Sequence, residues 1–147
     1  MKLSTATIIG THHTNHCEDF CIHRDIGASR LLIAVMDGCT MGTESHFAST
    51  LIGKILRKIA HQEYYREYGS KEVLDLDKLL EKVMIQLHAE LKRVTETLSL
   101  TKYELLSTIV LGIIDHRERE AQFMVIGDGV VIVDSQLHDF DQDNNPD

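Results

Sequence analysis

The fold of this chain is decided at Leu31-Leu32-Ile33-Ala34-Val35-Met36-Asp37-Gly38. Six apolar residues in succession are typical of a β-strand that is buried on both faces. The run ends abruptly at an Asp-Gly pair, which places a carboxylate where an apolar strand stops. A carboxylate in that position costs free energy unless a hydrogen bond or a cation compensates its charge.

Two amphipathic helices are predicted after this strand. Apolar residues recur at helical spacing over residues 47–59 and predict a helix over residues 44–66. A second apolar stripe over residues 76–98 predicts another helix, with Asp75 at its N-terminal end. Gly69 lies between the two stripes, where a break in the helical pattern is expected.

A β-hairpin is predicted further along the chain. Residues 105–114 and 122–134 are apolar and β-branched, and a charged turn separates them. Asp128 and its two flanking glycines interrupt the second segment, so we expect a bend there. The acidic, polar residues 139–147 are typical of a linker or a chain end. We therefore expect a single domain over residues 1–138, with an α+β fold of antiparallel β-sheets packed with two long antiparallel helices.

The composition is that of an acidic globular protein. The 147 residues include 15 Lys and Arg against 23 Asp and Glu, for a formal net charge of −8. This charge and the lack of a basic cluster argue against a nucleic-acid partner. The longest apolar runs are far too short to cross a bilayer, so no membrane partner is expected. The three cysteines and an N-terminus unlike a signal sequence predict a reduced, cytoplasmic chain.

Three acidic positions share the context of a strand end. Glu18 and Asp19 precede a strand, Asp37 follows one, and Asp128 lies between two glycines. Glycine beside a carboxylate leaves room for a cation and exposes a backbone carbonyl as a further oxygen ligand. Mg²⁺ and Mn²⁺ prefer oxygen ligands of this kind. The alternative is that each aspartate only caps a turn, because Asp-Gly pairs are common turn formers.

Four sequence motifs surround the two predicted helices. They are Asn15-His16-Cys17-Glu18-Asp19, Ile33-Ala34-Val35-Met36-Asp37-Gly38, Leu106-Ser107-Thr108-Ile109-Val110 and Met124-Val125-Ile126-Gly127-Asp128-Gly129. In this order they resemble the protein phosphatase 2C family. The resemblance implies that the chain is the N-terminal part of a phosphatase domain, which in this family is a layered β-sandwich flanked by helices.

The resemblance also implies a role for each matched acidic residue. Asp37 would bridge two Mg²⁺ or Mn²⁺ ions, and the Gly38 carbonyl would bind one of them. Glu18 and Asp19 would hold metal-bound water and act with Asp37 as the catalytic residues. Asp128 matches the position of a third, looser metal in some members. The implied reaction is hydrolysis of phosphoserine or phosphothreonine in a phosphoprotein substrate by metal-activated water.

The sequence departs from the family pattern before the first motif and in its length. An arginine that grips the substrate phosphate is replaced here by histidines, of which His13 is the candidate phosphate ligand. The family domain is longer, and two further metal-binding aspartates belong to the half that we expect to be missing. We therefore expect this chain alone to bind metal weakly and to have little or no activity. Exposed sheet edges predict self-association into a homo-oligomer.

Two other functions fit parts of the sequence. The densest cluster of His and Cys residues is a loose match to a structural zinc site. Its members are His12, His13, His16, Cys17, Cys21 and His23. A phosphatase-like scaffold that recognises a phosphoprotein without hydrolysing it is the other alternative. Ser107 and Thr108 lack a Gly-x-Ser-x-Gly context, so we interpret them as small strand residues that pack under the helices.

Overall fold

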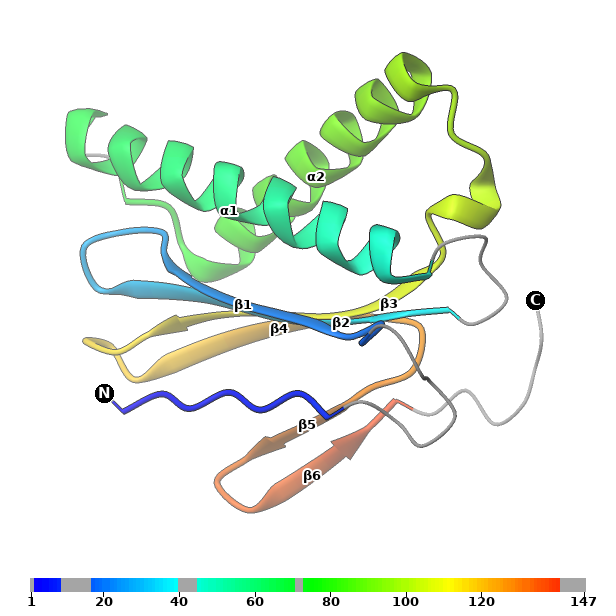
Figure 1. Cartoon of the computed structure of the whole chain (residues 1–147). Coiled ribbons are helices and arrows are strands. Elements are labelled where there is room, and N and C mark those ends of the chain that lie inside the picture. The colour runs from blue at the N-terminus through cyan, green and yellow to red at the C-terminus, as the bar shows by residue number, and fades with distance from the viewer. Residues whose placement is uncertain (1, 9–16, 40–44, 71–72, 141–147) are drawn as a thin grey trace.

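The computed structural model describes residues 2–8, 17–39, 45–70 and 73–140 (Figure 1). Along the chain these residues form strands β1 (Phe20–Asp25) and β2 (Arg30–Gly38), helices α1 (Ser45–Ser70) and α2 (Leu76–Leu98), and a short 3₁₀ helix, η1 (Lys102–Glu104). They continue with strands β3 (Ser107–Asp115), β4 (Glu120–Ile126), β5 (Val130–Val133) and β6 (Gln136–Asp139).

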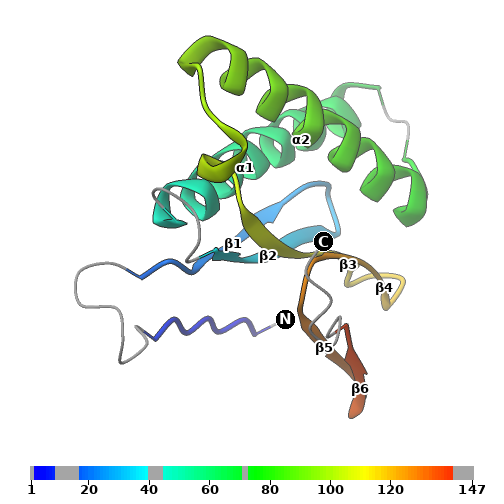
Figure 2. The same ribbon diagram turned by 90° about the vertical axis from the view of Figure 1, so that its right-hand side faces the viewer.

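The first four strands form one antiparallel sheet in the order β1-β2-β3-β4. Helix α1 crosses one face of this sheet above β1 and β2, whereas α2 lies on the same face and contacts β3 and β4 (Figures 1 and 2). Strands β5 and β6 form a separate two-stranded sheet on the opposite side. The predicted α+β fold, with antiparallel sheets and two long helices, is confirmed.

Strand β2 is buried along its helix-facing side and only in part on its other side. Ala34 and Met36 alternate with Val35 and point into the core beneath the helices, where Met36 is 0% exposed. Val35 points to the other face and is 57% exposed. The prediction of a strand buried on both faces therefore holds at Leu31, which is 9% exposed and shares the face of Val35, but not at Val35 itself. Asp37 continues the alternation and lies on this same helix-free face.

The two helices close the core from one side. Helix α2 begins as predicted, since the Asp75 carboxylate accepts a hydrogen bond from the Lys78 amide at 2.8 Å and caps the helix. Helix α1 extends to Ser70, beyond the predicted end at residue 66, and the Ser70 hydroxyl donates a hydrogen bond to the Arg66 carbonyl at 2.8 Å. Within the described residues, no helix is long and apolar enough to cross a membrane.

The predicted hairpin is present, but its second strand is shorter than expected. Strands β3 and β4 pair as predicted, and β4 ends at Ile126. Gly127 has a φ of 75°, so the chain turns away there and enters β5 in the other sheet. Strand β6 includes Asp139, which pairs with Val130, so the first residue of the predicted tail lies in a strand. Residues 141–147 lie outside the described part, and the division into a domain and a tail stays a prediction.

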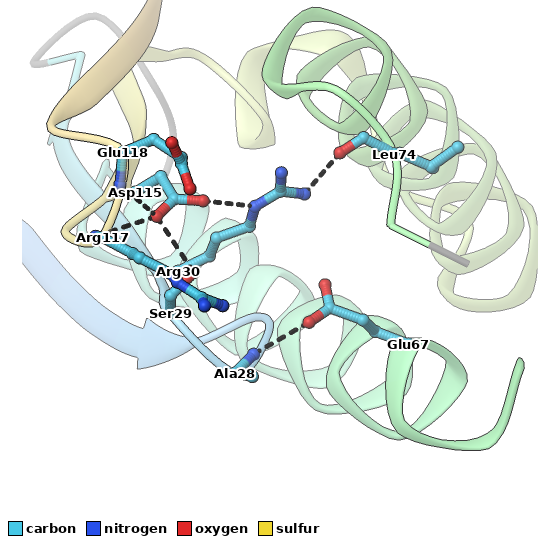
Figure 3. A network of polar contacts seen from close by, with 8 residues as sticks. All are labelled: Ala28, Ser29, Arg30, Glu67, Leu74, Asp115, Arg117 and Glu118. Carbon is cyan, nitrogen blue, oxygen red and sulfur yellow. Dashed lines mark hydrogen bonds and ion pairs between the residues drawn. The ribbon is translucent and has the colours of Figure 1, made fainter. Parts of the chain in front are cut away.

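A buried ion pair ties β2 to β3 at the end of the sheet away from Asp37. Arg30 and Asp115 are cross-strand partners, and the Arg30 Nε lies 2.9 Å from an Asp115 carboxylate oxygen. The carboxylate also accepts hydrogen bonds from the Ser29 hydroxyl at 2.9 Å and from two amides of the β3–β4 turn (Figure 3). Arg30 donates a further hydrogen bond to the Leu74 carbonyl before α2. One network therefore joins the sheet to the segment between the helices.

Candidate functional site

The segment before β1 is held against the end of β2. The Glu18 carbonyl accepts a hydrogen bond from the Gly38 amide at 3.2 Å. It also accepts one from the hydroxyl of Ser49, a fully buried residue in the first turns of α1. These two contacts place the acidic pair Glu18 and Asp19 beside the strand end that carries Asp37.

Asp37 is positioned by the pairing of β2 with β3. It lies opposite Thr108 in the register, and the Ser107 hydroxyl donates to the Asp37 carbonyl at 2.8 Å. One residue further on, the Cys39 amide donates to the Leu106 carbonyl at 3.1 Å. The strand end is therefore fixed on one side by β3, whereas the Asp37 side chain lies exposed on the helix-free face.

Thr108 links Asp37 to the third acidic position. A Cβ placed on Gly127 would lie 2.9 Å from the Thr108 side chain, so Gly127 and Asp128 adjoin the start of β3. Thr108 therefore lies between Asp37 and Asp128. Two steps of the usual strand spacing put Asp128 on the order of 10 Å from Asp37. Thr108 shares the face of Asp37, so the interpretation that it packs under the helices is wrong.

The structure therefore brings the predicted site residues to one end of the sheet. Glu18 and Asp19 come from the segment before β1, Asp37 from the end of β2, and Asp128 from the bend after β4. That end faces the viewer in Figure 2. The roles proposed for these residues stay predictions, because their position alone does not assign them.

The donor set fits a hard divalent cation in its chemistry. It consists of carboxylates with a glycine carbonyl nearby, which are oxygen ligands of the type that Mg²⁺ and Mn²⁺ prefer. In number it is incomplete, since in the described part of the chain no group of three or more His, Cys, Asp or Glu residues is arranged to hold a metal ion. Further oxygen ligands would be needed to complete such a centre.

Several predicted residues fall outside the described part of the chain. The candidate phosphate ligand His13 is one of them, as are His12 and His16 of the alternative zinc cluster. Of that cluster, Cys17, Cys21 and His23 are described, and both cysteines are free thiols. The Cys17 thiol lies 3.9 Å from an Asp19 carboxylate oxygen.

The sequence pattern predicts no role for Ser49, Arg30 or Asp115. A signal for the last two is nevertheless present, because one charged residue stands directly before an apolar strand and the other directly after one. Their pairing depends on the β2–β3 register, which the sequence pattern alone does not supply. Ser49 gives no signal, since a serine in a helix is usually solvent-exposed.

We expect Gly127→Ala to destabilise the domain by about 1–2 kcal/mol, because the backbone is in the left-handed region and the new methyl group would press on Thr108. The matched control is Gly69→Ala in α1, where an added Cβ meets nothing within 4 Å. That control should be neutral or stabilising by up to about 1 kcal/mol. Urea unfolding followed by circular dichroism measures both. Equal effects of the two substitutions would contradict this account of Gly127.

Comparison with known proteins identifies the family. A family model described as Protein phosphatase 2C matches residues 9–146. Among solved structures, the phosphatase domain of the cell fate determinant SpoIIE from Bacillus subtilis matches with 23% sequence identity and a TM-score of 0.41. This match covers 88% of this chain and 47% of that chain, so the present sequence spans about half the length of that structure. A search of the curated proteins gave no match. Because the family model covers almost all of the sequence, the chain belongs to the protein phosphatase 2C family.

Proposed function

We propose that this chain carries part of the catalytic centre of a metal-dependent protein serine/threonine phosphatase. The observation that supports the proposal is the position of Glu18, Asp37 and Asp128 at one end of the sheet, in a chain that belongs to this family. The proposed substrate is a phosphoprotein. The free thiols of all three cysteines agree with a reducing compartment, and we propose that the protein acts in the cytoplasm.

Each acidic residue has a task in this proposal. Asp37 and the Gly38 carbonyl would hold Mg²⁺ or Mn²⁺, and Asp128 would serve a looser additional ion. When bound, such ions lower the pKa of water and neutralise charge on the phosphoryl oxygens. Glu18 and Asp19 would orient the attacking water by accepting its hydrogen bonds. His13 is proposed to contact the substrate phosphate.

The backbone around Asp37 supports this division of tasks. The pairing of β2 with β3 and the hydrogen bond from Gly38 to Glu18 hold the carboxylate-bearing segments in fixed relative positions. Preorganised groups of this kind lower a barrier more than mobile ones, because they need no reorganisation during the reaction. Asp37 is an exposed residue, as access of a phosphorylated side chain to its carboxylate would require.

The test compares this chain with a version extended to the full length of the family domain. Both are assayed for hydrolysis of para-nitrophenyl phosphate in the presence of Mn²⁺, with EDTA as the metal-free control. We expect turnover by the extended protein that Asp37→Ala lowers by about 10²–10³-fold or more, since a group that stabilises transition-state charge is removed. Circular dichroism checks that the variant is folded.

The matched control is Glu96→Ala, which removes an exposed carboxylate on α2 far along the chain from the site. Its turnover should equal that of the parent protein. The enzyme proposal fails if the extended protein shows no Mn²⁺-dependent turnover, or if Asp37→Ala leaves the turnover unchanged. In the first case, binding of a phosphopeptide without hydrolysis would support the alternative of a non-catalytic recognition module.

A further inference from the structure

A pocket of about 280 Å³ lies between helix α1 and the edge strand β1. Its lining residues come from the end of β1 and from successive turns of α1; they are Arg24, Asp25, Arg57, His61, Tyr64 and Tyr65. Figures 1 and 2 show α1 running above β1 along this edge of the sheet. Arg24 lies four residues beyond Phe20, roughly 13 Å along the strand. The acidic residues Glu18, Asp37 and Asp128 are not among its lining residues.

Arg57 is the main reason to assign a ligand to this pocket. Its guanidinium carbon lies 5.2 Å from the centre of the Phe20 ring, and its Nε is buried without a hydrogen-bond partner. The other two arginines that are at least half-buried, Arg30 and Arg66, each form an ion pair with a buried carboxylate. Within the described residues Arg57 forms no such pair. A partly buried cation without a counter-charge costs free energy, which an anionic ligand would recover.

The other charges of the pocket leave it positive. Arg24 donates only to the neighbouring His23 carbonyl, at 3.3 Å, and forms no ion pair with the described carboxylates. Asp25 also lines the pocket, and its negative charge would repel a bound anion, but it forms no ion pair with Arg24 or Arg57. Two guanidinium groups against one carboxylate leave a local excess of one positive charge with histidine neutral. The chain has a net charge of −8, so this pocket is a positively charged region on an acidic protein and attracts oxyanions.

The walls indicate the shape of the ligand. The His61 and Tyr65 rings lie 4.8 Å apart, and Tyr64 packs edge-on against Tyr65 at 5.6 Å. Aromatic walls suit a ligand with an apolar or aromatic stem, and the guanidinium forks suit phosphate oxygens. The volume is slightly below the ~300–1,000 Å³ of typical small-molecule sites, so it suits a small group.

From these contacts we infer that the pocket is a binding site for a phosphate monoester, with Arg57 and Arg24 as ligands of the phosphate and the rings of His61 and Tyr65 against its stem. The monoester has two sources, a small metabolite or a phosphorylated side chain of a polypeptide. The inference does not rest on the proposed phosphatase activity, because it uses none of the acidic residues near Asp37.

The test measures binding of phenyl phosphate to the intact chain by NMR, from the shifts of the backbone amides of residues 57–65. We expect saturable binding that Arg57→Met weakens about tenfold or more, because a charge-assisted contact is lost while the packing on Phe20 is kept. Arg24→Gln, at an exposed position, should weaken binding similarly without a risk to folding. Asp25→Asn should strengthen it, since an opposing charge is removed.

Two controls separate this site from others. Arg93→Gln removes an exposed arginine on α2 that pairs with Glu90, and it should leave binding unchanged. Asp37→Ala should also leave it unchanged, so failure of the phosphatase proposal and failure of this one are distinguishable. Tighter binding of a phosphoserine peptide than of free phosphoserine identifies a polypeptide source, whereas equal binding identifies a small molecule. Absence of saturable shifts, or equal binding by Arg57→Met, Arg24→Gln and the parent protein, overturns the inference.

Discussion

Asp115→Ala is expected to lower the free energy of unfolding by about 3–5 kcal/mol. The Asp115 residue is 3% exposed, and its carboxylate accepts hydrogen bonds from Arg30, Ser29 and two turn amides. Removing it leaves the guanidinium of Arg30, a residue that is 8% exposed, without its counter-charge in the core (Figure 3). A buried charge without a partner is among the most costly single changes in a folded protein.

Urea unfolding followed by circular dichroism measures this loss. The matched control is Arg93→Ala, which breaks an ion pair of similar length whose arginine is 67% exposed. It should cost less than about 1 kcal/mol, because water and salt screen an exposed pair. The double variant Arg30→Met with Asp115→Leu should be more stable than Asp115→Ala, since no unpaired charge remains. A cost below about 1 kcal/mol for Asp115→Ala would contradict the role given to this network.

The same network predicts a dependence of stability on pH. Burial alone would raise the pKa of Asp115, but the hydrogen bonds from Arg30, the Glu118 amide, Ser29 and the Arg117 amide outweigh burial and lower it from 3.8 to about 2. A pKa that is lower in the folded state contributes stability above the unfolded value, and this contribution is lost as the pH falls from about 4 to about 2. This contribution of Asp115 to the free energy of unfolding is about 2 kcal/mol. The urea concentration at the unfolding midpoint should therefore change less with pH over this range in Asp115→Ala than in the parent protein.

Glu63→Ala is expected to cost about 2–4 kcal/mol, because it removes the acceptor at the centre of the contact between α1 and α2. Glu63 is 2% exposed, and its carboxylate accepts hydrogen bonds from Arg66 at 2.6 Å, Lys82 at 2.9 Å and Gln86 at 3.0 Å. Burial raises the pKa of Glu63, but these hydrogen bonds outweigh it and hold the pKa below its ordinary value. The carboxylate is thus stabilised in its charged form between two cationic side chains.

Thermal and urea unfolding of Glu63→Ala measure the effect. The control Glu81→Ala removes an exposed carboxylate from α2 and should change stability by no more than about 0.5 kcal/mol. Lys82→Met should recover part of the loss when combined with Glu63→Ala, because one of the stranded cations is removed with its partner. Additive effects of these two substitutions would show that Glu63 and Lys82 do not act as a pair.

The candidate site is predictable from the sequence in its residue types but not in its arrangement. The abrupt end of an apolar run at Asp37 and the glycines around Asp128 mark carboxylates at strand ends through local pattern alone. Their placement at one end of the sheet requires the register in which Asp37 lies opposite Thr108, and the contact of Gly127 with Thr108. The first of these contacts joins positions 71 residues apart, so no local pattern encodes it.

The helices and main strands were determined by the sequence itself, because their signals are local. The apolar stripe over residues 76–98 and the cap at Asp75 specify α2 through contacts of nearby residues alone. Only the tertiary structure decided which face of β2 is covered and that β5 leaves the main sheet after Gly127. It also decided that Arg57 lies over Phe20 and lines the same pocket as Arg24. Each of these depends on how separately formed elements pack together, and packing is governed by side-chain contacts between distant parts of the chain.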